Sequence, residues 1–231
     1  MGGEFVTAVS PECRNFLLEA FSGREELFDA FLEKMKLLQG ILYETNEQFN
    51  LTALPPEAFW SKHVADSLSL IRAFPQIGKQ SLSLLDLGCG AGFPSLVLAA
   101  AFPLLKVTAV DSTGKKISFV AAAAEQLSLE NLSAIHGRGN ELARKAPFKG
   151  AYDLVTARAV SSAENLVKES FSFLKEPGGV LAVYRTASQL AEEKAFLEKN
   201  KRLFWRSTEL FSLPEEAGMR QFLLLAKHPF P

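Results

Sequence analysis

Three glycines at every second position, followed by an aspartate at the end of the next apolar run, are the residues of this sequence best placed to do chemistry. The mostly apolar run Leu84–Leu87 stops at Gly88, and Gly90 and Gly92 follow. A turn without side chains lets a ligand lie against the backbone. Asp111 closes the next apolar run, where its carboxylate can accept both hydroxyls of a ribose. We therefore predict a site for a nucleoside-containing cofactor.

The residue after the third glycine indicates which cofactor this is. Phe93 stands where a dinucleotide-binding turn has a glycine. A pyrophosphate requires exposed amides at a helix N-terminus, whereas the positively charged sulfonium of S-adenosylmethionine does not. The turn therefore favours S-adenosylmethionine. The contacts predicted from this turn and from the end of the following strand are Gly88, Gly90, Gly92, Phe93, Asp111 and Ser112.

Short apolar runs alternate with helical stretches from Ser81 onward, which is typical of a parallel sheet covered by helices on both faces. We expect strands at about 82–87, 106–111, 131–136, 152–157 and 179–184, and helices around 94–102, 114–127, 138–145, 162–175 and 187–200. Two extended segments, 203–213 and 220–227, should close the sheet as an antiparallel pair. The pattern predicts an α/β class I S-adenosylmethionine-dependent methyltransferase domain over residues 79–231, Rossmann-like with a seven-stranded sheet.

Residues 1–78 are expected to form an N-terminal helical lobe. Apolar residues at spacings of three and four predict a long amphipathic helix: Leu27, Phe31, Met35, Leu38 and Leu42. A second helix should begin at Pro55-Pro56, because proline is tolerated in a first turn. It would bring His63, Asp66 and Ser67 within reach of one another. His63 is either a structural residue or a site residue, and the polar segment 46–54 would cover the site.

Further candidates follow the third and fourth strands, because ligands of open α/β sheets lie beyond the carboxyl ends of the strands. Gly139 would let its backbone approach an adenine, and Asn140 could bond the adenine amine. Equally, these two residues could simply begin the next helix. Arg158 ends a buried strand beside the expected methyl donor, which favours a site role over a surface charge.

The absence of certain motifs narrows the choice of atom that could accept the methyl group. The loop Asp/Asn-Pro-Pro-aromatic, which holds an exocyclic amine for methylation, is replaced by Thr156-Ala157-Arg158-Ala159. Methylation of a pyrimidine carbon needs a cysteine nucleophile, and neither Cys13 nor Cys89 is placed for it. Ring N7 of guanine carries an in-plane lone pair and needs no base, so alignment with the methyl donor can supply most of the rate.

Composition restricts the partners, bound groups and cellular location that can be expected for this chain. The 231 residues carry 25 Lys plus Arg against 26 Asp plus Glu, a net charge of -1, so no global basic field indicates a nucleic acid partner. RNA contact would need a local patch, for which Lys115, Lys116 and Arg138 are candidates. Two distant cysteines make a disulfide or a metal site unexpected. No membrane span or signal peptide is apparent, so we expect a cytoplasmic protein, and a monomer.

Several segments together make the chain resemble the RsmG (GidB) family of bacterial methyltransferases. The resemblance runs from about Leu37 to Lys227, and it rests on Asn46, Phe49-Asn50-Leu51-Thr52, Lys62-His63-Val64-Ala65-Asp66-Ser67-Leu68, Leu85 to Pro94, Asp111-Ser112, Lys115-Lys116, Phe119, Arg138 and Arg158-Ala159-Val160. It implies methylation of N7 of a guanine in small-subunit (16S) ribosomal RNA, with that RNA or the small ribosomal subunit as partner. It also implies cofactor contacts at Gly88, Phe93, Asp111, Gly139, Asn140 and Arg158.

Arg158 and His63 are the residues that we expect at the catalytic centre. The chain departs from the family pattern in three places: Ser95 replaces a glycine, Asn140 replaces an acid, and Arg185-Thr186 replaces Lys-Gly. Arg185 keeps the positive charge of that lysine and is expected to contact RNA. Two alternatives stay open. One is a class I methyltransferase that acts on another RNA, a protein or a small molecule, and the other is a nucleotide-binding module without catalysis.

Overall fold

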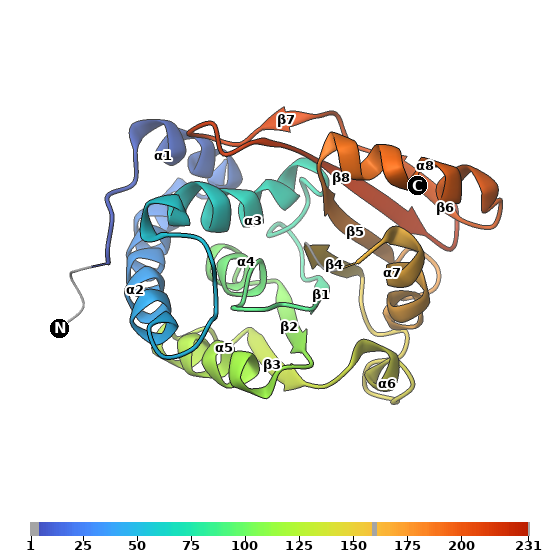
Figure 1. The fold of residues 1–231 in the computed structure, drawn as a ribbon, viewed down its shortest axis with the longest axis horizontal. Helices are drawn as coiled ribbons and strands as arrows, with labels where there is room; N and C mark the ends of the chain where they lie inside the picture. The colour runs from blue at the N-terminus through green and yellow to red at the C-terminus, as the bar shows by residue number, and fades with distance from the viewer. Residues whose placement is uncertain (1–4, 159–160, 231) are drawn as a thin grey trace.

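The computed structural model describes residues 5–158 and 161–230, so Ala159 and Val160 of the family pattern lie outside the described residues. A central sheet carries helices on both of its faces (Figure 1). The strands are β1 Ser83–Leu87, β2 Lys106–Asp111, β3 Leu132–His136, β4 Leu154–Arg158, β5 Val180–Arg185, β6 Phe204–Ser207, β7 Phe211–Ser212 and β8 Met219–Ala226.

The order of the strands is β3-β2-β1-β4-β5-β8-β6, and the two-residue β7 pairs with β8 off this path. Strands β1 to β5 are parallel, whereas β8 is antiparallel to both β5 and β6. The predicted Rossmann-like sheet of seven strands is confirmed, with β7 as an extra strand. The direction of the connections reverses between β1 and β4, which places a ligand at the carboxyl ends of these strands.

Alternation along the strands divides the core between the two faces of the sheet. The helices that cover the sheet are α4 Ser95–Ala101, α5 Gly114–Gln126, α6 Gly139–Leu142, α7 Ala163–Ser170 and α8 Ala187–Lys199. Leu84 belongs to the core between one face of the sheet and α4, α5 and the N-terminal helices. Leu85 belongs to the core between the other face and α6, α7 and α8. None of the helices in the described ranges combines the length and apolar character that crossing a bilayer requires.

The N-terminal helices cover the α4 side of the sheet and share its hydrophobic core (Figure 1). The first two are α1 Pro11–Leu18 and α2 Phe28–Asn46. The expected helix after Pro55 is present but is not a regular α-helix. It passes through a 3₁₀ turn at Pro56–Ala58, a π-helix at Phe59–Ala65, the short α3 Asp66–Leu68 and a second 3₁₀ turn at Ser69–Arg72.

Side-chain hydroxyls account for part of this irregularity. Ser67 Oγ donates to the carbonyl of His63 at 2.6 Å, and Ser69 Oγ donates to the carbonyl of Asp66 at 2.6 Å. Such bonds compete with the helical backbone ladder. π-Helical turns also occur frequently at functional sites, and this one carries His63 on its inner side, 4 % exposed. The division into a lobe over 1–78 and a domain over 79–231 stays a prediction.

Candidate functional site

The glycine turn after β1 is fixed to the end of β2. The amides of Gly88 and Cys89 both donate to the carbonyl of Val110, at 2.8 and 3.0 Å. Gly90 and Gly92 have φ of +57° and +87°, a region that other residues rarely adopt. A Cβ at Gly92 would lie 2.4 Å from Leu96 Cδ1, whereas a Cβ at Gly90 would meet nothing within 4 Å. Gly92 is thus required by packing, and Gly90 leaves its backbone open to a ligand.

Asp111 connects the glycine turn to the helix that follows β2. Its Oδ2 accepts from the amide of Gly90 at 3.0 Å, and its Oδ1 accepts from the amide of Thr113 at 2.8 Å. A carboxylate oxygen has two lone pairs, so each oxygen of Asp111 can accept a further hydrogen bond. The side chain is therefore oriented in advance and still has acceptor capacity for two ribose hydroxyls.

A cavity of about 490 Å³ lies beyond β1, β2 and β3. It is bordered by the turn, by the end of β2 and by the start of α6: Leu87, Gly88, Asp111, Ser112, Arg138, Gly139 and Asn140 are among its lining residues. A Cβ at Gly139 would lie 2.7 Å from Leu87 Cδ1, so a larger residue here would have to displace the end of the Leu87 side chain. The structure therefore brings Gly139 and Asn140 together with Asp111, as the order of the strands requires.

A second cavity of about 460 Å³ begins on the other side of Gly88. Gly88 lines both cavities, so they meet at the glycine turn. The lining comes from the segment 51–54, the π-helix, the ends of β4 and β5 and the start of β8, and it includes His63, Asp66, Phe93, Arg158 and Arg220. Segments that are far apart in the chain thus form one chamber beside the predicted cofactor site.

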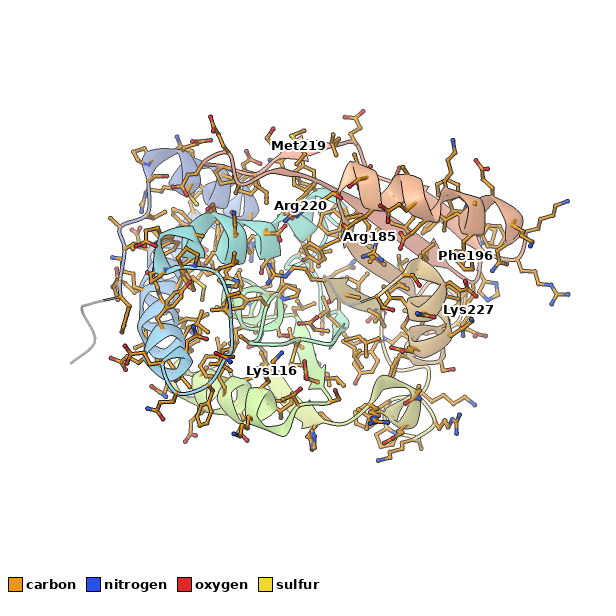
Figure 2. The ribbon with its side chains drawn as sticks, in the orientation of Figure 1. Lys116, Arg185, Phe196, Met219, Arg220 and Lys227 are labelled. Carbon is orange, nitrogen blue, oxygen red and sulfur yellow. The ribbon has the colours of Figure 1, made fainter. Side chains whose placement is uncertain are left out.

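Asp66 is a buried carboxylate between two arginines in this second cavity. Its side chain is 4 % exposed, its Oδ2 accepts from Arg158 Nη1 at 3.2 Å, and its Oδ1 accepts from Arg220 Nε at 3.0 Å. Arg158 Nη1 also donates to the carbonyl of Lys62 at 3.0 Å. Figure 2 shows Arg220 between β8 and the α3 segment. The two ion pairs connect the N-terminal helices to the sheet at β4 and at β8.

His63 and Phe93 form a stacked pair on the wall of the same cavity. Their ring centroids are 4.1 Å apart with an interplanar angle of 19°. Thr52 Oγ1 lies 3.0 Å from His63 Nε2, and His63 Nδ1 has no partner among the described residues. Burial, with a smaller contribution from the charge of Arg158, lowers the pKa of His63 from 6.5 to about 3. The imidazole is therefore neutral and a weak base.

A second buried carboxylate, Asp86, lies in β1 just before the glycine turn. Burial raises its pKa from 3.8 to about 6, while hydrogen bonds from Ser95 and Thr156 act in the opposite direction. Both the amide and the hydroxyl of Ser95 donate to Asp86 Oδ2. The serine that departs from the family pattern thus provides this carboxylate with a donor. Burial also raises the pKa of the Cys89 thiol, which makes it an unreactive group in the turn.

Arg185, which we predicted to contact RNA, is a buried residue at the lining of the second cavity. Arg185 is buried, and its Nη2 and Nε donate to the carboxylate of Glu193 at 2.8 and 3.0 Å. Nη2 also donates to the carbonyl of Ser161 at 2.6 Å. Figure 2 shows Arg185 enclosed on the β5 side of the molecule, whereas Lys116 comes from α5 on the other side. The guanidinium therefore joins β5 to α8, and contact of Arg185 with RNA stays a prediction.

The other basic candidates lie where a long ligand can reach them. Lys115 is exposed in the first turn of α5, Lys116 is half-buried beside it, and Arg138 is exposed at the edge of the first cavity. Sequence reasoning missed Arg220, which reaches Asp66 only because β8 pairs with β5. No local signal marks such a contact, since the partners are separated by 154 positions.

The donor set fits S-adenosylmethionine. Asp111 offers carboxylate oxygens, Gly90 offers open backbone, and the first cavity has a size usual for small-molecule sites. Within the described ranges, no group of three or more His, Cys, Asp or Glu side chains is placed to hold a metal ion. The sheet order and this site define the class: the chain is a class I S-adenosylmethionine-dependent methyltransferase.

Comparison with known proteins identifies the family. The model of the GidB family, rRNA small subunit methyltransferase G, matches residues 31–221. The chain therefore belongs to this family. It is 39% identical over 169 residues to the ribosomal RNA small subunit methyltransferase G of Lactococcus lactis subsp. lactis (strain IL1403), covering 73% of this chain and 70% of the relative. It is 36% identical over 207 residues to that of Brevibacillus brevis (strain 47), covering 88% and 83%.

The fold is also similar to that of a solved methyltransferase. The O-methyltransferase from Bacillus cereus in complex with SAH aligns with a TM-score of 0.56 at 12% identity, covering 83% of this chain and 90% of that chain. At this level of identity the similarity concerns the fold alone. It agrees with the Rossmann-like sheet described above.

The lowered pKa of His63 gives a testable pH dependence. The unfolded chain takes up a proton on His63 near pH 6.5, but the folded chain resists protonation down to about pH 3. Stability contributed by neutral His63 is thus complete above pH 6.5 and is lost as the pH falls toward 3. Nuclear magnetic resonance should show a neutral His63 ring from pH 5 to 8, and His63→Phe should remove this pH dependence. A ring that becomes protonated near pH 6.5 in the folded protein would contradict the assignment.

Proposed function

We propose that this chain transfers a methyl group from S-adenosylmethionine to N7 of a guanine in 16S ribosomal RNA. The observation that carries the proposal is the pair of cavities that meet at Gly88, within a chain of the rRNA small subunit methyltransferase G family. One cavity has the acceptors for a nucleoside, and the other provides an adjacent chamber for a target base. Among the described residues, nothing favours another RNA, a protein or a small molecule as acceptor.

The cofactor residues fall on both sides of the glycine turn. Asp111 and Ser112 would hold the ribose, and Gly139 and Asn140 would border the adenine. On the other side, Gly88, Gly90, Phe93 and Arg158 line the second cavity, and Gly92 shapes the turn between Gly90 and Phe93. The cofactor supplies an electrophilic methyl group on a sulfonium. The contribution of the chain is to hold the donor and the acceptor in line.

Guanine N7 suits a chamber in which the Asp66 carboxylate is paired with two arginines and the His63 imidazole is a weak base. N7 attacks through a lone pair and loses no proton, so positioning is the main contribution that the protein has to make. His63 is too weak a base to remove a proton near neutral pH, and its stacked ring fixes Phe93 at the wall of the cavity. Arg158, 17 % exposed and held by Asp66, would orient a negatively charged part of the donor or of the RNA. We place both residues in the catalytic centre as positioning groups.

RNA would approach across the edge of the sheet that carries the cavities. Lys115, Lys116 and Arg138 lie at this edge and would bind phosphates, which contribute affinity without reading sequence. The partner would be 16S ribosomal RNA, free or in the small ribosomal subunit. We further propose a cytoplasmic location, where ribosomes are assembled, and a monomeric enzyme whose helical lobe, residues 1–78, covers the cofactor domain, residues 79–231.

Removal of the Asp111 carboxylate should weaken cofactor binding. In Asp111→Ala we expect the Kd for S-adenosylmethionine to rise roughly ten- to hundredfold, because hydrogen bonds to charged groups contribute about 1.5–3 kcal/mol. Titration calorimetry measures this Kd directly. Glu130→Ala is a suitable control, since this acidic side chain is exposed and lies outside the first cavity. An unchanged Kd in Asp111→Ala would remove Asp111 from the ribose site.

The position of the methyl group in the product RNA tests the proposed reaction. Methylation at N7 gives a positively charged purine with a weakened glycosidic bond, so borohydride followed by aniline should cleave the RNA at the modified guanine. RNA from cells that lack this protein should resist cleavage, and purified protein with S-adenosylmethionine should restore it. A methyl group found instead on an exocyclic amine, a ribose oxygen or a pyrimidine carbon would contradict the proposed acceptor and leave the cofactor assignment intact.

A further inference from the structure

An exposed aromatic ring and a lysine face each other across the gap between the segment 47–54 and α5. Phe49 is 40% exposed, and Lys115 Nζ lies 4.9 Å from the centroid of its ring. We propose that Phe49 and Lys115 form a nucleotide-stacking contact that binds an unstacked base of the RNA next to the target guanine. This inference rests on the proposed function and adds a site that holds the RNA outside the two cavities.

The segment that carries Phe49 is held rigidly by one side chain. Asn46 Oδ1 accepts from the amides of Leu51 and Thr52 at 2.8 and 2.9 Å, and Asn46 Nδ2 donates to the carbonyl of Thr52 at 3.1 Å. The backbone of Phe49 is also engaged, since its amide donates to Thr45 and its carbonyl accepts from Leu51. A ring presented by a pre-organised segment loses little conformational entropy when it binds.

The location of the pair is suited to a contact beside the target base. Leu51 and Thr52 line the second cavity, so the Cα of Phe49 lies within about 8 Å of a cavity-lining residue, given 3.8 Å between consecutive Cα atoms. Lys115 lies in the first turn of α5, the helix that follows Asp111 and Ser112 of the first cavity. The pair thus connects the segment 47–54, which borders the second cavity, to α5, which begins just after residues that line the first cavity.

The chemistry of the pair matches a nucleotide better than it matches an apolar partner. Sequence-specific proteins bind RNA mainly at unstacked bases, which they stack on aromatic rings. Lysine supplies a positive charge for the phosphate of the same nucleotide. An apolar protein surface would instead have to bury the ammonium of Lys115 beside Phe49, which is costly without an opposite charge. RNA is therefore the partner that the contact favours.

The test is the dependence of the methylation rate on RNA concentration, with small subunits from cells that lack this protein as substrate. In Phe49→Ala we expect KM for the subunits to rise by about five- to a hundredfold, because base–aromatic stacking contributes at this level. In Phe49→Trp the ring is kept and KM should stay within twofold of wild type. The Kd for S-adenosylmethionine should change by less than about twofold in both variants, because the ring lies outside the cofactor cavity.

Two exposed residues at the amino end of β2 provide matched controls on the opposite edge of the sheet. Leu104→Ala removes an apolar side chain that is 53% exposed, and Lys106→Ala removes an exposed lysine. Neither should change KM for the subunits. Lys115→Ala should raise KM and reduce the salt dependence of binding by about one unit in slope, whereas Lys106→Ala should leave the slope unchanged.

Four results would overturn the inference. One is a wild-type KM in Phe49→Ala. Another is a KM that rises as much in Phe49→Trp as in Phe49→Ala. The third is weakened binding of S-adenosylmethionine in Phe49→Ala, which would make the segment part of the cofactor site. A rise in KM on intact subunits that vanishes on protein-free 16S RNA would also contradict it, since a ribosomal protein would then be the partner. If wild-type protein does not methylate the subunits at all, the proposed function fails instead.

Discussion

The buried carboxylate of Asp66 is the interaction on which the site depends. It is held by Arg158 at the end of β4 and by Arg220 at the start of β8, and it comes from the irregular helix that also carries His63. Buried charges require partners, and the loss of one partner from a buried pair typically costs about 3–5 kcal/mol. The two ion pairs therefore fix the position of the N-terminal helices over the carboxyl edge of the sheet. The second cavity exists because these elements meet there.

The rest of the chamber follows from this arrangement. With the helix in place, the ring of His63 stacks on Phe93, and Thr52 on the adjoining segment lies at hydrogen-bond distance from its Nε2. The burial of His63 also lowers its pKa, so its imidazole is neutral and too weak a base to take a proton from an acceptor near neutral pH. An acceptor that needs no proton removal is compatible with such surroundings, and guanine N7 is an acceptor of this kind.

The parts of this structure that could be predicted from the sequence are those determined by local patterns. Alternating apolar runs identified β1 to β5 within one or two residues, and the glycine turn with Asp111 identified the region of the first cavity. The π-helix at Phe59–Ala65 could not be predicted, because it depends on how buried side chains and hydroxyls satisfy the backbone. The burial of Arg185 against Glu193 and the contact of Arg220 with Asp66 depend on tertiary packing that charge and position in the chain do not reveal.

The most direct test of this account is the rate of methyl transfer in a single turnover by Asp66→Asn, which keeps the shape of the side chain and removes its charge. Asp29→Asn is the control, because Asp29 pairs with Arg14 at the surface. At a temperature at which both variants remain folded by circular dichroism, we predict a rate at least about tenfold below wild type for Asp66→Asn, since small displacements of positioning groups can cost up to about a hundredfold. Asp29→Asn should react at the wild-type rate. A folded Asp66→Asn protein that also reacts at the wild-type rate would contradict the account.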